Sequence, residues 1–135
     1  YLTQGSKEKP KELICELQEI MYKDAGLIRS EDSLHNALNK LVDLKARASD
    51  VRAEGSKRYN LAWIDAIDLQ NMIHVAELIC VSALQRKESR GAHYRSDYPN
   101  LENACVKHFC VALDEDDGMR ITSTPIVRTR GEVES

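Results

Sequence analysis

Apolar side chains recur at helical spacing in the first part of the chain. Four of them lie at intervals of 4, 3 and 1 positions, which places them on one face of a helix: Leu13, Leu17, Ile20 and Met21. Pro10 suits the first turn of such a helix, and Gly26 is typical of the position just after its end. The pattern therefore predicts an amphipathic helix that begins at Pro10 and is terminated by Gly26.

A second amphipathic helix is predicted after Ser30. This residue is a favourable N-cap, and Glu31 and Asp32 place negative charge on the first turn, where the helix dipole favours it. The expected apolar stripe consists of Leu34, Leu38, Leu41, Val42 and Ala48. Basic residues are expected on the opposite side, at Lys40, Lys45, Arg47 and Arg52. Gly55 and Ser56 are expected to end this helix.

A third helix is expected from Asn60, as its cap, to Gln85. Its expected main stripe is Ile64, Ile67, Met72, Val75, Ile79 and Ala83, but apolar residues cover more than one face. A helix this widely apolar is usually buried on several sides, so it is either central or carries a second apolar face for a partner. Short connections between three helices predict a mainly α fold, a spectrin-repeat-like three-helix bundle running up-down-up.

The pattern changes after Pro99 and predicts a small C-terminal β-hairpin. Residues 106–113 are expected to form one strand and residues 119–127 the other, with Pro125 at an edge. Asp114 to Gly118 is expected to form the turn, since Asp-Gly is a strong hairpin signal. The expected organisation is a disordered leader at 1–9, the bundle at 10–99, the hairpin appendage at 100–128 and a frayed tail at 129–135.

Composition restricts the class of protein. The chain has 135 residues, 42% apolar and 30% charged, with a net charge of −3. Mild acidity argues against nucleic-acid binding. No uninterrupted apolar run approaches the roughly 20 residues that span a bilayer, so direct membrane insertion is not expected. The polar start, with Lys7, Lys9 and Lys11, is unlike a signal peptide, and a first residue of Tyr suggests a piece of a longer protein.

The four cysteines are scattered without a C-x-x-C pair: Cys15, Cys80, Cys105 and Cys110. We therefore expect reduced thiols, as in a cytosolic compartment. Cys105, His108 and Cys110 match no zinc spacing, so no metal site is expected.

The run from Arg86 to Pro99 concentrates the candidate chemistry. Arg90 and Arg95 could bind a carboxylate or phosphate in a two-point geometry, and His93 could donate a proton near neutral pH. The alternative is a structural clamp that ties the loop to the bundle or to a neighbouring domain, with Gly91 permitting a turn and Asp97 pairing with one arginine. The clamp is favoured, because polar clusters fix loops more often than they perform chemistry.

The familiar nucleotide, hydrolase and metalloprotease motifs are missing from the sequence: G-x-G-x-x-G, Walker A, G-x-S-x-G and H-E-x-x-H. No nucleotide site is therefore recognisable in the chain, and as an isolated piece it is not expected to be an enzyme.

The segment Glu88-Ser-Arg-Gly-Ala-His93, continued by Tyr-Arg-Ser-Asp-Tyr-Pro99, closely resembles a signature in the C-terminal helical domain of succinate dehydrogenase and fumarate reductase flavoprotein subunits. Residues 11–29 resemble that domain's first helix and the short loop that ends in an arginine. Residues 60–86 resemble its long third helix, and residues 106–127 its closing hairpin. The resemblance covers about residues 11 to 128.

The resemblance implies a part of an FAD-dependent enzyme that interconverts succinate and fumarate. The flavin and the catalytic residues would lie in upstream flavin-binding and capping domains, and this chain would bind no cofactor itself. Implied partners are those domains and an iron-sulfur subunit, in the cytoplasm, with membrane association only through partner subunits. The implied interdomain docking residues are Glu88, Ser89, Arg90, His93, Arg95 and Asp97. The alternatives are a related flavoprotein (L-aspartate oxidase or adenylylsulfate reductase) and a free-standing helical interaction module.

Overall fold

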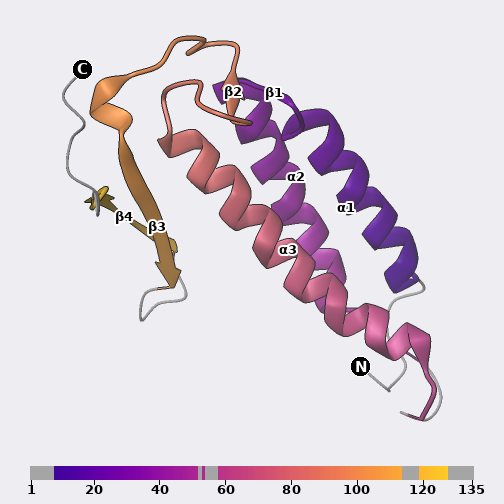
Figure 1. Ribbon diagram of the computed structural model, residues 1–135. Coiled ribbons are helices and arrows are strands. Elements are labelled where there is room, and N and C mark those ends of the chain that lie inside the picture. Colours follow the sequence, from indigo (N-terminus) through magenta and orange to yellow (C-terminus); the bar gives the residue numbers. More distant parts are fainter. Residues whose placement is uncertain (1–7, 52, 54–57, 114–118, 128–135) are drawn as a thin grey trace.

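The computed structural model describes residues 8–51, 53, 58–113 and 119–127. Three long helices lie side by side, α1 (Pro10–Asp24), α2 (Glu31–Ser49) and α3 (Leu61–Gln85), and the chain then leaves the top of α3 towards a separate hairpin (Figure 1). Short elements complete the order: β1 (Ile28–Arg29), β2 (Tyr94–Arg95), η1 (Asn103–Cys105), β3 (Lys107–Leu113) and β4 (Met119–Pro125). The predicted mainly helical fold with three helices and a small antiparallel sheet is confirmed.

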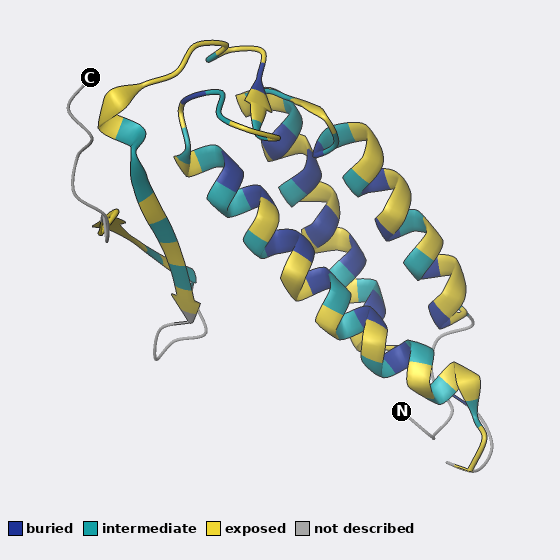
Figure 2. Ribbon diagram, in the orientation of Figure 1, coloured by how far each residue is buried: buried dark blue, intermediate teal, exposed yellow. Residues whose placement is uncertain are grey.

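Each helix contacts the other two, and the core lies between them. Figure 2 shows the buried positions on the sides of the helices that face one another. Leucine and alanine dominate this core, because the chain contains few aromatic residues. Its fully or nearly fully buried members include Leu13, Leu17, Leu34, Ala37, Leu41, Leu44, Leu69, Ile73, Ala76 and Cys80.

Residues close in sequence determine where α1 ends and where α2 begins. Ala25 caps α1, and Gly26 follows it as expected. A Cβ on Gly26 would lie 2.4 Å from the Tyr22 carbonyl oxygen, so close approach requires glycine there. Ser30 caps α2 by accepting from the Ser33 amide at 3.1 Å, and the Ser33 hydroxyl accepts from the Ser30 amide in return.

The end of α2 and part of its stripe differ from the prediction. The helix stops at Ser49, with Asp50 as its C-cap, and Val51 is buried beyond it. Val42 is 65% exposed, and Ala37 and Leu44 are buried instead, because they lie on the side that faces the other helices. Arg52, Gly55 and Ser56 lie outside the described residues. Of the basic residues, Lys45 pairs with Glu77, and Arg47 pairs with Glu8 and Glu16.

The buried face of α3 also differs from the predicted stripe. The deeply buried positions are Ala66, Leu69, Ile73, Ala76, Cys80 and Ala83, whereas Ile64, Val75 and Ile79 are between 42% and 54% exposed. By length and composition alone, α3 could cross a membrane. We did not predict this from the sequence, because we considered only uninterrupted apolar runs. A core helix of a soluble protein passes the same test, so this is weak evidence of a span.

The hairpin has the predicted strands. β3 and β4 are antiparallel, with Lys107 opposite Pro125, Phe109 opposite Ser123 and Leu113 opposite Met119. The expected turn at 114–118 lies outside the described residues, as do residues 1–7 of the expected leader and the tail from 128 onward. β3 contacts α3, and this contact connects the hairpin to the bundle.

A second, unpredicted sheet joins distant parts of the chain. β1 and β2 pair in parallel, with Ile28 beside Tyr94 and Arg29 beside Arg95. This pairing brings the α1–α2 connection against the loop that follows α3. It thereby assembles the candidate site.

Candidate functional site

The loop after α3 is folded back on itself at Gly91. The amide of Arg90 donates to the His93 carbonyl at 2.8 Å, and the His93 amide donates to the Arg90 carbonyl at 3.0 Å. Gly91 adopts a φ of 59°, in the left-handed region that favours glycine. Gly91 therefore has a conformational role: it allows the tight turn that places Arg90 and His93 next to each other.

Glu88 is the buried centre of the loop. Its side chain is fully buried, and it accepts hydrogen bonds from Arg86 Nη1 at 2.7 Å, Arg90 Nη2 at 2.9 Å and the Glu102 amide at 3.0 Å. Chiefly because Arg90 donates to it, the pKa of Glu88 is held at about 2, although burial acts in the opposite direction. The carboxylate joins the end of α3 to the segment that leads into η1.

Arg95 is the second buried charge. Its fully buried guanidinium donates to the Ala83 carbonyl at 3.0 Å and forms a two-point pair with Asp97. Asp97 also accepts from the Glu31 amide at 2.9 Å, at the first residue of α2. The hydrogen bonds from Arg95 lower the pKa of Asp97 well below its usual range. This pair therefore ties the end of α3 to the start of α2.

Ser89 connects the two strands of the loop. Its hydroxyl accepts from the Arg95 amide at 2.9 Å and donates to the Tyr98 carbonyl at 2.8 Å. The Ser89 amide donates to the Asn100 carbonyl at 3.0 Å. These bonds hold the ends of the loop together.

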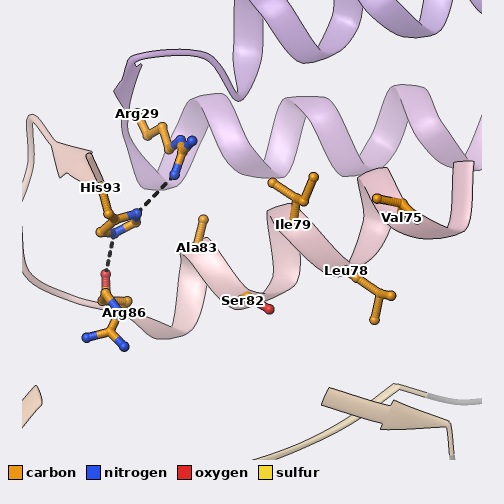
Figure 3. Close-up of a pocket in the computed structure, with 8 residues that line it drawn as sticks. All are labelled: Arg29, Val75, Leu78, Ile79, Ser82, Ala83, Arg86 and His93. Atoms are coloured by element: carbon orange, nitrogen blue, oxygen red, sulfur yellow. Dashed lines mark hydrogen bonds between the residues drawn. The ribbon is translucent and has the colours of Figure 1, made fainter. Parts of the chain in front are cut away.

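His93 bridges the loop to the connection between α1 and α2. Its Nδ1 lies 3.1 Å from Arg29 Nη1 and its Nε2 lies 3.2 Å from the Arg86 carbonyl oxygen (Figure 3). A guanidinium can only donate and a carbonyl can only accept, so His93 is the neutral tautomer with the proton on Nε2. Burial lowers the pKa of His93, and the charges of Arg29, Arg86 and Arg95 act in the same direction.

A cleft of about 380 Å³ begins at this histidine and follows α3. Figure 3 shows Arg29 and His93 at one end and Val75 at the other, with Ile79 and Ser82 between them. We call it the Arg29 cleft, lined by Arg29, Val75, Leu78, Ile79, Ser82, Ala83, Arg86 and His93. One end of the cleft is cationic, and its wall along α3 is aliphatic.

The six predicted docking residues thus lie in one network, but with different exposure. Glu88 and Arg95 are completely buried within the chain, while the Arg90 side chain is 38% exposed. Ser89 and His93 are half-buried, and Asp97 lies at the surface. Sequence reasoning missed Arg29, Arg86 and Glu102 as members, although Arg29 ends the loop noted in the resemblance. Across the part of the chain that the structure describes, no group of His, Cys, Asp or Glu residues could hold a metal ion.

The arrangement is a hydrogen-bonded polar network at one end of a helical domain, and comparison with known proteins shows where such domains occur. The family model for the C-terminal part of the fumarate reductase flavoprotein matches residues 15–134. A fumarate reductase flavoprotein subunit of Haemophilus influenzae is 30% identical over 131 residues, which cover 96% of this chain and 22% of that protein. A succinate dehydrogenase flavoprotein subunit of Coxiella burnetii is 37% identical over 103 residues, covering 75% and 18%.

A solved structure gives the same result. The Sdh1 complex of Mycobacterium smegmatis in the apo form contains a chain with a TM-score of 0.84 and 34% identity, and the match covers 96% of this chain and 23% of that one. These matches define the class as a domain of a flavoprotein oxidoreductase. The chain belongs to the family of succinate dehydrogenase and fumarate reductase flavoprotein C-terminal domains, as the signature had indicated. It spans less than a quarter of the length of these relatives.

The two related flavoproteins considered as alternatives are also homologous. A chloroplastic L-aspartate oxidase of Arabidopsis thaliana is 36% identical over 94 residues, covering 70% of this chain and 14% of that protein. Adenylylsulfate reductase of Archaeoglobus fulgidus has a TM-score of 0.80 and 28% identity, with coverage of 89% and 20%. The helical domain is therefore shared among flavoproteins with different names.

Proposed function

We propose that this chain is the helical closing domain of an FAD-dependent enzyme that interconverts succinate and fumarate, and that it supports the flavin-binding part of that enzyme. The family consists of FAD-dependent flavoprotein subunits. In this proposal the flavin and the catalytic residues belong to other domains, and this chain binds no cofactor and performs no chemical step. The partners are the flavin-binding and capping domains and an iron-sulfur subunit, in the cytoplasm and at a membrane only through partner subunits.

The observation that carries this proposal is a second apolar face on α3. Leu61, Ile64, Val75 and Ile79 are all at least 42% exposed. Their spacings of 3, 11 and 4 residues are each close to a whole number of helical turns, so they lie on one side of the helix, where the exposed Asp68 separates Ile64 from Val75. Exposed apolar stripes of this kind mark interaction surfaces. The stripe runs along α3 from its first residue, and its Ile79 end lies towards the loop that carries the docking residues.

Within the loop, the proposal gives two different roles to the six docking residues. The buried Glu88 and Arg95, with Ser89 and Asp97, set the shape of the loop from within. Arg90 reaches the surface in part and makes the polar contacts with the flavin-binding part. Both ring nitrogens of His93 bond within the chain, to Arg29 and to the Arg86 carbonyl, so His93 supports docking by holding the loop in place. We also propose that α1, α2 and α3 run up-down-up, as the short connection through β1 and the mutual helix contacts favour.

Substitution in the full-length flavoprotein tests the proposal. Arg90→Ala leaves Glu88 bonded to Arg86 and to the Glu102 amide, so the domain should still fold. We expect lower flavin retention and a lower Tm for the full-length protein, with a smaller change in the Tm of this chain alone. Arg58→Ala, an exposed cation at the other end of α3, is the matched control. Unchanged flavin content, stability and turnover in Arg90→Ala would refute docking through this loop.

A further inference from the structure

The β3–β4 hairpin depends on a narrow attachment to the helical bundle. Figure 1 shows it at one side of α3, and β3 packs chiefly against that helix. β4 is exposed over most of its length. A two-stranded hairpin is at best marginally stable in water without a surface on which to pack. The contacts that hold β3 against α3 therefore decide whether the hairpin keeps its structure.

Arg86, the C-cap of α3, makes several of these contacts with one side chain. Its Nη1 donates to the Cys105 carbonyl at 3.0 Å, and its Nη2 donates to the Lys107 carbonyl at 3.0 Å. The guanidinium also lies over the Phe109 ring, 4.7 Å from the ring centre. It thus contacts every second residue along the first part of β3 and the residues that lead into it.

Glu88 sets the direction of this guanidinium. Its fully buried carboxylate accepts from Arg86 Nη1 at 2.7 Å, while the Arg86 carbonyl accepts from His93 Nε2 at 3.2 Å. The other groups that donate to Glu88 are the Arg90 side chain and the Glu102 amide, and both lie outside the strands. Of the three donors to Glu88, Arg86 is the one that contacts β3. Glu88 therefore acts on the hairpin through Arg86.

We propose that Arg86 is a latch that holds the hairpin against α3 while Glu88 orients it. Loss of the guanidinium, or displacement of Glu88, releases β3, whereas the core between α1, α2 and α3 stays packed. The hairpin and the loop that carries Glu88 are thereby coupled, so a movement of the loop is transmitted to the strands. This inference concerns the chain itself and does not depend on the proposed role in a flavoprotein.

Amide hydrogen exchange followed by NMR tests the latch. Arg86→Gln removes the guanidinium and leaves Glu88 with its two other donors. We expect the amides of β3 and β4 to exchange at least about tenfold faster, since hydrogen bonds from a charged group and a cation–π contact are lost together. The amides of Leu41 and Ile73, in the core, should change by less than about twofold. The matched control is Lys87→Gln, which removes the neighbouring exposed cation and should leave both sets of amides unchanged.

Two further variants separate a latch from a general loss of stability. Phe109→Leu keeps an apolar side chain on β3 and removes the ring under the guanidinium, so it should also speed exchange in the strands without disturbing the loop. Glu88→Gln should speed strand exchange by itself but add nothing to it in the Arg86→Gln background, because it acts through Arg86.

Three results would overturn the proposal. The first is unchanged strand exchange in Arg86→Gln. The second is equal acceleration in the core helices and the strands of Arg86→Gln and Phe109→Leu, which would indicate a general destabilisation. The third is full additivity of Glu88→Gln and Arg86→Gln in the exchange of the strands, which would mean that the two residues act independently.

Discussion

Arg95 and Asp97, two residues apart in the sequence, form a two-point ion pair in which the guanidinium is completely buried. Nε lies 2.7 Å from Oδ1 and Nη2 lies 2.5 Å from Oδ2. The pair lies where the end of α3 meets the start of α2, so a short stretch of loop chemistry holds two helices together. Its removal has consequences that can be measured.

Asp97→Asn should destabilise the chain by about 2–3 kcal/mol, because it leaves the buried Arg95 without its counter-charge. Because Asp97 is partly exposed, the expected loss lies below the roughly 3–5 kcal/mol that breaking a fully buried pair costs. The free energy of unfolding from urea titration checks this. Asp68→Asn, an exposed change on α3, serves as the control and should stay within about 0.5 kcal/mol. Equal stability of both variants would mean that water replaces Asp97 at no cost.

Acid should weaken the chain through Glu88. Its pKa in the folded state is about 2, below the value of an unfolded glutamate. A lowered pKa contributes stability that is complete above about pH 4.5 and is lost as the pH falls towards 2. Urea titrations at constant ionic strength should show this decline, and Glu88→Gln should reduce it to the part that is due to Asp97, whose pKa is also lowered. As a control, the variant Glu12→Gln changes an exposed glutamate and should show the full loss of stability in acid. A reduced loss in this control would mean that Glu88 is not the cause of the decline.

His93 should remain neutral at pH values where a free histidine is half protonated. Its lowered pKa arises from burial, with Arg29, Arg86 and Arg95 adding to it. Protonation would also remove the acceptor at Nδ1 that binds Arg29. NMR titration of the His93 ring should give a midpoint below the 6.5 of an unperturbed histidine. Since the folded pKa is the lower one, the stability due to His93 falls as the pH decreases through this range. A midpoint at or above 6.5 would contradict the bonding described here.

Gly26 and Gly91 should differ in their response to alanine, for different physical reasons. Gly91→Ala meets no atom within 4 Å, so its cost is the left-handed φ alone, about 1 kcal/mol. Gly26→Ala places Cβ 2.4 Å from the Tyr22 carbonyl oxygen and should cost about 2 kcal/mol or more, because the end of α1 must move. Thermal and urea unfolding of both variants would establish the order, and the reverse order would contradict it.

The sequence by itself determined the local features of this protein. Pro10, Ser30 and Asn60 mark the beginnings of the helices, and the hairpin strands follow from alternation around an Asp-Gly turn signal. These features depend on neighbours a few residues away, so periodicity and capping chemistry are sufficient. The segment from Glu88 to His93 was also enough to identify the family, because its residue sequence is a specific signature.

Only the tertiary structure decided which faces are buried and which charges meet. α3 is apolar on more than one side, so its pattern could not show that Ile73 is buried while Val75 is exposed. The pairing of Arg29 beside Arg95 joins residues far apart in the sequence, and it places His93 against Arg29. Likewise, the burial of Glu88 and Arg95 depends on the helices packed around them. Such long-range contacts arise from how faces fit in three dimensions, and no local pattern encodes that fit.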